Sequence, residues 1–474
     1  MILLAATVAM QAKPTMPKIF GDNMVLQQNS EVALWGSAKK NAKVTVTASW
    51  SKKSVSTTSN GEGKWSLRLT TPAAGGPYEV QVSDGEKLSF SNVLIGEVWL
   101  CSGQSNMEMP MRGFRSQPVE GASEYIATAR PECPIRMFTV KRVPAYEVKE
   151  DVEGGEWLMH TPQAVSNCSA TAYFFAEMVQ KVTGVPVGLV ISNWGGTRIE
   201  PWLDEATMRA NSTEDLSFLQ TKNAKNPQYK PTMLFNSMIA PIIPYTIKGI
   251  IWYQGESNRM SPQLYEKLQA AYVQMMRDYW NDQNIPFYFT QIAPYNYDNP
   301  DKIDCGKFRD AQTATLKTIP HSGMAVTLDI GDAGCIHPAA KKEVGHRLAY
   351  LALTNDYGLQ GISAKSPVYK SMEVKDGKVI VYMDVDPAGL APLGHNLANT
   401  FKDGKEYVCF EVAGEDRVFH PADVATIECP NKIVVSCEAV PEPVAVRYCY
   451  RNFTVGNLFN CWGFPASSFR TDNW

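Results

Sequence analysis

Residues 93–107 of the chain, VLIGEVWLCSGQSNM, indicate the fold class. They contain an apolar strand that is followed directly by a polar loop with a glycine and two serines near its start. The run Val93–Leu100 predicts a buried strand, and a glycine with short polar residues follows it at 101–107. Further apolar runs alternate with helical patterns, down to a helix expected after Pro338. This alternation predicts a parallel sheet with helices on both faces, in which ligands bind beyond the carboxyl ends of the strands. The alternating segments are a helix at 171–182, strands at 187–192 and 250–253, a helix at 263–280, and strands at 287–292 and 323–328.

The segments on either side of this region show the short alternating runs of β structure. In residues 13–93 such runs are broken by turn signals at Asn60-Gly61 and at Gly75-Gly76-Pro77, which predicts a small β-sandwich. Residues 359–474 return to alternating runs and hold half of the ten cysteines. We therefore expect a β-sandwich at 13–93, an α/β domain at 94–358 and a cysteine-rich β module at 359–474. The runs in the first module are Val32–Gly36, Val44–Thr47 and Trp65–Leu69.

The composition argues against two classes of partner. The 474 residues include 45 Lys and Arg against 48 Asp and Glu, which gives a formal net charge of −3 with no basic stripe. No nucleic-acid partner is therefore indicated. No run reaches the roughly 18 apolar residues of a membrane span. The sequence does not indicate an oligomeric state.

The first twelve residues and the cysteines both favour an oxidising compartment. Residues 1–12, MILLAATVAMQA, resemble the apolar region of a secretory signal peptide, which predicts a secreted or periplasmic protein. Clustered cysteines in an exported chain predict disulfides, although their connectivity does not follow from the sequence. The alternatives are a buried first strand and buried free thiols.

Four of the predicted strands end in unusual polar sequence, at 101–107, 192–198, 254–258 and 329–338. Together these loops supply a serine after a glycine, a Gly-Gly pair, an amide, and a histidine near aspartates. A serine hydroxyl needs a base to become a nucleophile, and the oxyanion that forms needs fixed N–H donors. The loops therefore predict acyl-transfer chemistry. Because no HExxH motif and no cluster of histidines with carboxylates occurs, no metal or other cofactor is expected.

Ser105 and Ser257 compete for the role of nucleophile, since both stand in a Gly-X-Ser-Asn pattern. Ser105 follows the first strand of the α/β region and precedes a helix start at 107–111, so its own N–H can point at the oxyanion. Ser257 adjoins Glu256, whose charge would oppose a developing oxyanion. We expect Ser105 to be the nucleophile and Ser257 to be an ordinary turn or cap residue.

His337 is the candidate for the base. Pro338 fits the first position of a helix, which places His337 at the helix cap, in the same loop as two aspartates. An aspartate from that loop would hold the imidazole in one tautomer, and we prefer Asp332 to Asp329, which ends the strand and can cap its turn. The alternative is a Ser-His pair helped by a backbone carbonyl.

Three motifs carry a resemblance to a known family: Gly103–Met107, Trp252–Ser257 and Ile336–Pro338. With them, the sequence resembles the sialate O-acetylesterase family of the SGNH (GDSL-like) hydrolase superfamily. The stretches Ile19–Gln27 and Phe469–Asp472 resemble the opening and the ending of that family, so the resemblance covers essentially the whole chain. It implies a flavodoxin-like three-layer α/β/α hydrolase domain between the β-rich modules, and hydrolysis of O-acetyl groups on sugars.

The resemblance also implies roles for individual residues. Ser105 would be the nucleophile and His337 the general base. The oxyanion hole would be formed by the N–H of Ser105, the N–H of Gly196 or Gly195, and the side chain of Gln254.

This sequence departs from the family pattern at the acidic residue that would complete a Ser-His-Asp triad. In much of the superfamily the acid lies three residues before the histidine, where this chain has Gly334, and many relatives have an aspartate two residues before it, where this chain has Cys335. The departure puts Asp332 in doubt. It also suggests that Cys335 is held in a disulfide, with Cys305 as the partner.

The implied substrate is an acetylated glycan. Arg198 can engage the carboxylate of a sialic acid bidentately, or can pair with Glu200 or Glu256 instead. O-acetylated sialic acid is the first candidate, and acetylated xylan or another plant polysaccharide is the alternative. A non-catalytic carbohydrate-binding protein with an esterase-like core is the alternative of another class. The candidate substrate-binding residues are Gln104, Asn106, Arg198, Tyr253 and Glu256.

Overall fold

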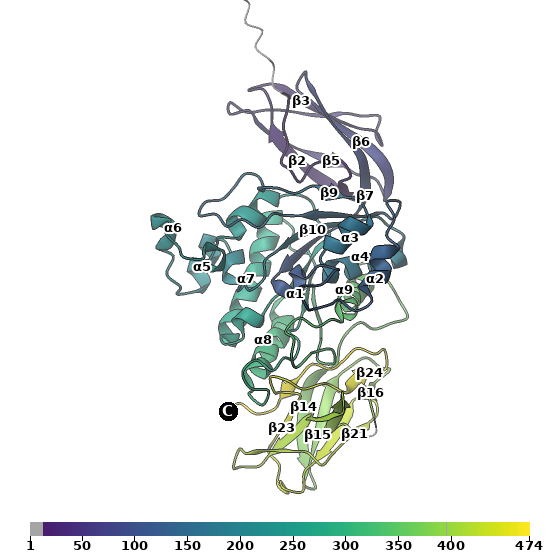
Figure 1. Cartoon of the computed structure of the whole chain (residues 1–474), viewed down its shortest axis with the longest axis vertical. Helices are drawn as coiled ribbons and strands as arrows, with labels where there is room; N and C mark the ends of the chain where they lie inside the picture. The colour runs from purple at the N-terminus through teal and green to yellow at the C-terminus, as the bar shows by residue number, and fades with distance from the viewer. Residues whose placement is uncertain (1–12, 395) are drawn as a thin grey trace, which may run out of the picture.

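The three-dimensional structure is a computed structural model, which describes residues 13–394 and 396–474. The predicted signal segment 1–12 lies outside the described residues. Three parts follow one another along the longest axis of the molecule, with N-terminal strands at the top, an α/β core in the middle and C-terminal strands at the bottom (Figure 1). Within the described part, no helix is both long and apolar enough to cross a membrane.

The core is built on one sheet with the strand order β13-β12-β11-β7-β10-β8-β9. Neighbouring strands are parallel, except that β9 runs antiparallel to β8. Every residue of β10, β11 and β12 is buried, as expected of a parallel sheet covered on both faces. The strands are β7 (Lys87–Gly103), β8 (Ile135–Thr139), β9 (Trp157–Leu158), β10 (Val187–Asn193), β11 (Gly249–Tyr253), β12 (Phe287–Thr290) and β13 (Ser322–Ala325).

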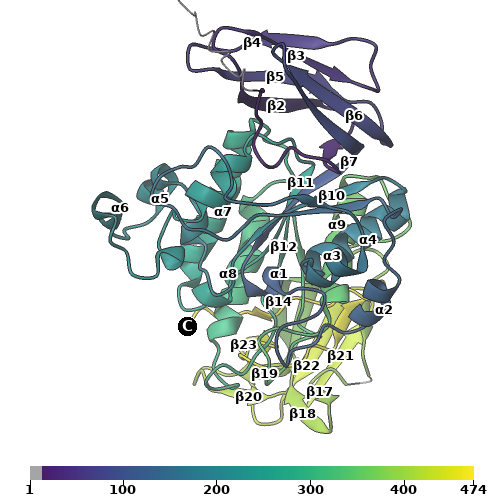
Figure 2. The same ribbon diagram turned by 45° about the horizontal axis from the view of Figure 1, so that its top comes forward.

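Helices cover both faces of the core sheet (Figure 2). Trp99 and Cys101 of β7 share an apolar cluster with α4 and α9, whereas Leu100 between them shares another cluster with α7 and α8. This alternation confirms the predicted α/β core with flanking helices. The helices are α1 (Ser105–Glu108), α2 (Ala122–Ala127), α3 (Pro162–Asn167), α4 (Ala170–Thr183), α5 (Glu205–Asn211), α6 (Phe218–Thr221), α7 (Pro262–Trp280), α8 (Asp304–Thr318) and α9 (Lys341–Asn355). The single turns are η1 (Glu200–Trp202), η2 (Pro227–Tyr229), η3 (Phe235–Ile239), η4 (Ala240–Ile242) and η5 (Glu256–Asn258).

Strand β7 occupies the switch point of the sheet, because the chain continues to β8 and β10 on one side and to β11 on the other. Its last residue, Gly103, lies opposite both Asn193 and Tyr253, so three strands end together. Gly103 has a φ of +143°, and a Cβ there would lie 2.2 Å from the Tyr253 carbonyl oxygen. Only glycine therefore allows the strands to approach this closely.

The N-terminal part consists of two sheets, β2-β5 and β4-β3-β6-β7, and β7 continues from it into the core across the predicted boundary at residue 93. The three predicted strands are confirmed as β2, β3 and β5. The turn predicted at 75–77 is wrong, because Gly75 starts β6 and pairs with Ile95, and an irregularity in the register absorbs the Gly-Pro step. The remaining strands are β1 (Val25–Gln27), β2 (Glu31–Ser37), β3 (Lys43–Ala48), β4 (Val55–Thr58), β5 (Lys64–Thr70) and β6 (Gly75–Ser83).

The C-terminal part contains two four-stranded antiparallel sheets, β14-β15-β22-β21 and β20-β19-β23-β25, and two two-stranded sheets, β16-β24 and β17-β18. Its β character agrees with the prediction. The strands are β14 (Val368–Lys375), β15 (Lys378–Asp384), β16 (Leu390–Pro392), β17 (Asn399–Lys402), β18 (Lys405–Val408), β19 (Phe410–Ala413), β20 (Phe419–Pro421), β21 (Val424–Glu428), β22 (Lys432–Ser436), β23 (Ala445–Tyr448), β24 (Leu458–Asn460) and β25 (Phe469–Arg470).

All ten cysteines are free thiols in the structure, so it does not contain the expected disulfides. Cys305 is buried in the first turn of α8. Cys335 is half-buried in the loop before α9, where its Sγ lies 3.2 Å from the carbonyl oxygen of His337. The two thiols are packed in separate surroundings, and the suggested bridge between them is absent.

Candidate active site

Ser105 opens α1 directly after the switch-point strand and is half-buried. The residue before it, Gln104, fixes this position from both its backbone and its side chain. The Gln104 N–H donates to the Tyr253 carbonyl at 2.9 Å, and Gln104 Oε1 accepts the N–H groups of Gly255 and Ser257, each at 3.3 Å. The loop that follows β7 and the loop that follows β11 are thereby bonded together beneath the serine.

His337 lies in the loop between β13 and α9, and its ring is oriented by a residue from a distant segment. Its Nδ1 is 2.7 Å from Oε1 of Gln117, which belongs to the connection between α1 and α2. An amide oxygen only accepts, so Nδ1 carries the proton and Nε2 has a free lone pair. The ring of Phe114 packs against the imidazole edge-on at 5.2 Å between centroids. The histidine therefore has the tautomer of a general base.

The aspartates of the histidine loop have other partners. Asp332 Oδ1 accepts the N–H groups of Gly334 at 2.7 Å and Cys335 at 3.0 Å, which closes a local turn. Asp329 forms a two-point ion pair with Arg347, at 2.8 and 2.6 Å. Contrary to the expectation for Asp332, the described structure places Gln117, not an aspartate, on His337.

Asn106 bonds the serine segment to the histidine loop. Its side chain is fully buried, and Nδ2 donates to the carbonyl oxygen of Ile336 at 3.1 Å and to Oε1 of Glu256 at 2.5 Å. Since Asn106 follows Ser105 directly, the backbone that carries the nucleophile is connected to the residue that precedes the histidine.

Lys341 completes this connection from the first turn of α9. Its side chain is also fully buried, and Nζ donates to Asn106 Oδ1 and to the Pro338 carbonyl oxygen, each at 2.7 Å. The residues on both sides of His337 are thus held by one amide and one ammonium group. The helix predicted to begin at Pro338 begins at Lys341 instead, so His337 lies in the loop and not at the cap.

Burial and charge set the protonation of these groups. Burial lowers the pKa of His337 to about 4, and the nearby Lys341 charge acts in the same direction. Burial also lowers the pKa of Lys341 to about 7, an effect that Glu256 opposes. Burial raises the pKa of the Glu256 carboxyl above its ordinary value. His337 is therefore neutral, and able to accept a proton, over most of the acid range.

Two backbone N–H groups remain for an oxyanion. Gly195 is close to the serine, since a Cβ there would lie 3.3 Å from Ser105 Cβ, but its N–H donates to Glu108 Oε2 at 2.5 Å. The N–H groups of Ser105 and of exposed Gly196, which has a φ of +73°, have no protein acceptor in the described part of the chain. This difference favours Gly196 over Gly195 as the second donor.

Gln254 does not have the geometry of an oxyanion donor. It is fully buried, and its Nε2 donates to Gln104 Oε1 at 3.1 Å, to the Thr197 carbonyl at 3.3 Å and to Asn258 Oδ1 at 2.8 Å. The amide is thus occupied beneath the site, where it joins three strand-end loops. The expectation that it faces the oxyanion does not agree with this arrangement.

Replacing Gln254 with alanine should therefore weaken the fold more than the chemistry. The change removes the donor for three buried oxygens and leaves a cavity, so we expect a loss of about 2–4 kcal/mol in the free energy of unfolding. The kcat of the folded fraction should fall by less than about tenfold. Urea unfolding and initial rates on the same samples check this. A drop of about 10²–10³ in kcat at unchanged stability would restore the oxyanion role.

Most of the predicted substrate-binding side chains are inaccessible. Gln104, Asn106, Tyr253 and Glu256 are each no more than 4% exposed, and their contacts are internal. The Arg198 side chain is 38% exposed, but it is paired with Glu200 at 3.2 Å and with Glu214 at 2.7 Å. Among the predicted five, only Arg198 can reach a ligand.

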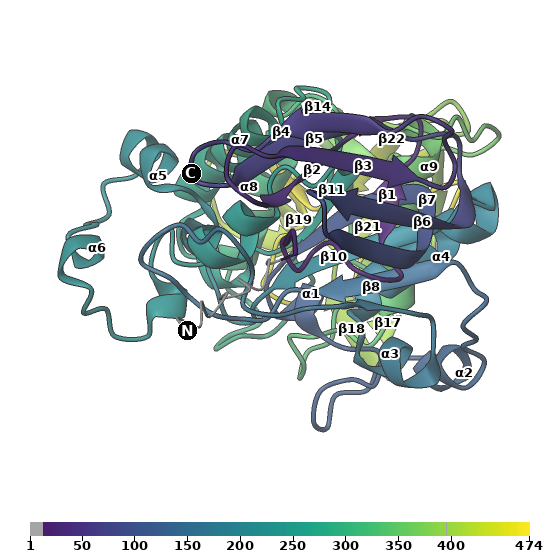
Figure 3. The same ribbon diagram turned by 90° about the horizontal axis from the view of Figure 1, so that it is seen from above.

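One aromatic residue near the site was not predicted. Tyr229 of η2 is 42% exposed, and its hydroxyl would lie 3.5 Å from a Cβ at Gly196. The η2 turn belongs to the long excursion between β10 and β11 that carries α5 and α6 out to one side (Figure 3). The tyrosine thus presents an exposed aromatic side chain beside Gly196.

Comparisons with known proteins identify a matching family model and curated relatives. A family model described as carbohydrate esterase, sialic acid-specific acetylesterase matches residues 95–354. Sialate O-acetylesterase of Mus musculus is 27% identical over 490 aligned positions, which cover 90% of this chain and 87% of that protein. The Homo sapiens protein of the same name is 28% identical, over 74% of this chain and 73% of its own length.

A solved structure extends the similarity to the whole fold. The crystal structure of a carbohydrate acetylesterase from Xanthomonas citri is 34% identical, with a TM-score of 0.87, and the match covers 97% of this chain and 100% of that one. The family model covers more than half of this chain. The family, the fold and the acetylesterase activity of the relatives agree with the resemblance seen in the sequence. The chain therefore belongs to the carbohydrate esterase family of sialic acid-specific acetylesterases and is a carbohydrate acetylesterase.

Proposed function

We propose that this enzyme releases acetate from O-acetylated sialic acids through an acetyl-enzyme, with Ser105 as nucleophile, His337 as general base and Gln117 as the group that orients the base. The observation that carries the proposal is the 2.7 Å contact between His337 Nδ1 and Gln117 Oε1. That contact presents Nε2 as a proton acceptor, in a loop bonded to the segment of Ser105 through Asn106.

The proposed reaction has two halves. Ser105 Oγ attacks the acetyl carbonyl carbon while its proton passes to His337 Nε2, and the N–H groups of Ser105 and Gly196 stabilise the oxyanion. The C–O bond to the sugar then breaks, and the sugar oxygen takes the proton from His337. In the second half, water loses a proton to the same nitrogen, attacks the acetyl carbon and releases acetate as Ser105 recovers its proton.

The choice of sialic acid is supported by relatives and by Arg198. The family model and the curated relatives are described by sialic acid or sialate. The half-exposed guanidinium of Arg198 can exchange one of its carboxylate partners for the carboxylate of the sugar.

Acetylated xylan is the second candidate, and the double pairing of Arg198 favours it. Glu200 and Glu214 together already balance the Arg198 charge, which lowers the benefit of a further carboxylate. A neutral acetylated polysaccharide needs no cation at this position.

Acetate release from an O-acetylated sialic acid and from acetylated xylan distinguishes the two candidates. We expect the larger kcat/KM for the sialic acid, and a selective loss on that substrate alone when Arg198 is changed to Gln. Equal losses on both substrates would assign Arg198 to packing. A larger kcat/KM for xylan that Arg198→Gln leaves unchanged would replace sialic acid with the neutral glycan.

Changing Gln117 to Ala should lower kcat about 10- to 100-fold with little change in KM, because the imidazole loses the acceptor that fixes its tautomer. Gln117→Glu keeps an acceptor and adds an anion, which raises the pKa of His337. Because protonated His337 is inactive, wild-type activity should fall as the pH drops through about 4, and in the Glu variant it should fall at a higher pH. Rate profiles against pH measure this, with exposed Arg115→Ala as the control. A wild-type rate in Gln117→Ala would exclude the orienting role.

A further inference from the structure

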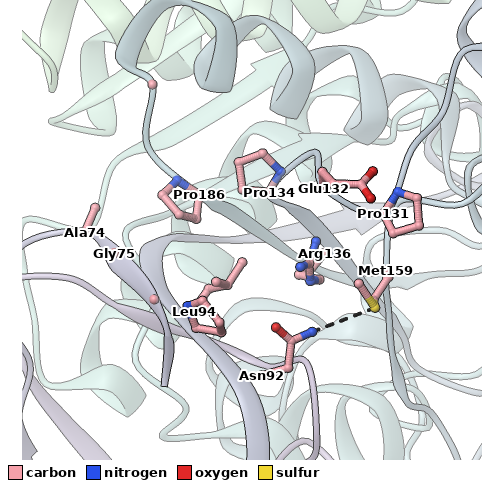
Figure 4. A pocket seen from close by; sticks show the side chains of 13 residues that line it. Ala74, Gly75, Asn92, Leu94, Pro131, Glu132, Pro134, Arg136, Met159 and Pro186 are labelled. Carbon is pink, nitrogen blue, oxygen red and sulfur yellow. Dashed lines mark hydrogen bonds between the residues drawn. The ribbon is translucent and has the colours of Figure 1, made fainter. Parts of the chain in front are cut away.

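A cavity of about 510 Å³ lies between the N-terminal sandwich and the beginning of the core sheet. Figure 4 shows Gly75 and Leu94 of the sandwich side facing Pro134, Arg136 and other residues of the core side. Its volume falls in the range of about 300–1,000 Å³ that small-molecule sites have, and its lining joins apolar walls with a few polar groups, as such sites do. Neither the catalytic residues nor their supporting network reach it.

The unusual residue of this cavity is Arg136, the second residue of β8. It is only 4% exposed, and its Nη1 donates to the carbonyl oxygens of Cys133 at 3.0 Å and Ile135 at 3.2 Å. Its Nε is buried without any partner, and the guanidinium forms no ion pair with a carboxylate in residues 13–394 and 396–474. Burial also lowers the pKa of the Arg136 guanidinium, because the charged form loses its contact with water. A buried charge without a counter-charge is costly, so the arrangement suits an anion that arrives with a ligand.

The other residues that line the cavity indicate which further groups a ligand with such an anion would need. Four prolines, a leucine and a methionine supply the apolar walls: Pro77, Leu94, Pro131, Pro134, Met159 and Pro186. Asn92 Nδ2 is occupied by Asn23 Oδ1 at 2.7 Å and by the Met159 sulfur at 3.7 Å, which leaves the Asn92 amide oxygen as an acceptor (Figure 4). A ring with C–H faces, hydroxyl donors and one carboxylate matches these surfaces.

We propose that this cavity binds an acidic sugar of the hexuronic acid class, with its carboxylate on Arg136 and a hydroxyl on Asn92. The site is separate from the catalytic one. Pro186 precedes β10 and the catalytic loops follow it, so the seven residues of β10 put about 20 Å between them. The cavity would hold an acidic branch of a glycan, or a free acidic sugar, while the serine acts elsewhere. Its absence would leave the proposed acetylesterase function untouched.

Isothermal titration calorimetry with three probes tests the site: D-glucuronate, D-glucose and acetate. Glucose has the ring without the carboxylate, and acetate has the carboxylate without the ring. We expect glucuronate to bind the wild-type protein at least about tenfold more tightly than either of the others, because it alone uses both features. Arg136→Met should abolish this binding, whereas Arg130→Met, at an exposed neighbouring arginine, should leave it unchanged.

Two further results decide between a ligand site and a structural arginine. Arg136→Met removes a costly unpaired charge but also the donor to the Cys133 and Ile135 carbonyls, so the melting temperature should change little and the rate of acetate release should be kept. Glu132→Gln, which removes an anion from the cavity lining, should tighten glucuronate binding. The proposal fails if no probe binds, if acetate binds as tightly as glucuronate, if Arg136→Met still binds glucuronate, or if that change lowers the melting temperature sharply.

Discussion

Ser105→Ala should abolish acetate release, with a fall in kcat of about 10⁴-fold or more. This loss is expected because the proposed mechanism transfers the acetyl group to Ser105 Oγ. The fold should not be affected, because the Ser105 hydroxyl makes no hydrogen bond in the described structure and the side chain is half-buried. Initial rates and thermal melting of the same preparation check both halves of this prediction.

The chain offers a matched control in Ser257, which stands in the same Gly-X-Ser-Asn pattern. Its N–H is bonded to Gln104 Oε1, and it lies beside the buried carboxyl of Glu256. Ser257→Ala should therefore retain a rate within about threefold of wild type, the range expected of a residue outside the reaction. A wild-type rate in Ser105→Ala, or a loss in Ser257→Ala comparable to the one predicted above, would exclude Ser105 as the nucleophile.

Lys341→Met should have the second largest effect, because it removes the ammonium group that holds both the serine side and the histidine side. Asn106 Oδ1 and the Pro338 carbonyl would each lose a buried donor, so we expect a loss of about 2–5 kcal/mol in the free energy of unfolding. The kcat should fall about 10- to 100-fold as the histidine loses its fixed position.

The pH profile distinguishes this positioning role from a merely structural one. At acid pH the Lys341 charge helps to hold the pKa of His337 at about 4, so its removal should move the acid limit of kcat/KM to a higher pH. Lys342→Met, one residue further along α9, keeps the Lys341 contacts and should keep the wild-type profile. Lys341→Arg should restore the charge and part of the rate if the methionine variant folds poorly. An acid limit unchanged in Lys341→Met would contradict the electrostatic part of the role.

The features that the sequence predicts correctly are local. A run such as Val93–Leu100 carries its strand signal in its own composition, and the glycine at 103 marks the place where neighbouring strands must meet. Parallel topology then brings the loops after β7, β10, β11 and β13 to one edge of the sheet. The proposal that Ser105 is the nucleophile and His337 the base needs little more than this.

The features that the sequence does not predict depend on long-range contacts or on local competition. Gln117 meets His337 across 220 positions, from a segment without periodicity, and an amide has no catalytic signature. Lys341 meets Asn106 across 235 positions and reads as an ordinary helix residue. The short separation in sequence predicts Asp332 as the partner of His337, but in the structure its carboxylate accepts the N–H groups two and three residues further on.

The position of the Gln254 side chain is another feature that the sequence does not predict, because it depends on long-range contacts. An amide at a strand end suits an oxyanion in sequence terms, yet three buried oxygens from three loops surround it here. Whether a polar side chain faces the substrate or the interior is decided by how the loops pack, which no single segment encodes.

Covalent labelling of the nucleophile, in which the serine oxygen displaces fluoride from phosphorus, tests the central claim most directly. A fluorophosphonate, which reacts with a serine only when a base activates it, should add one group per chain to the wild-type protein. Peptide mapping should place that group on Ser105, and His337→Ala should greatly slow the labelling. A label on Ser257, or no label on an enzyme that still releases acetate, would contradict the account.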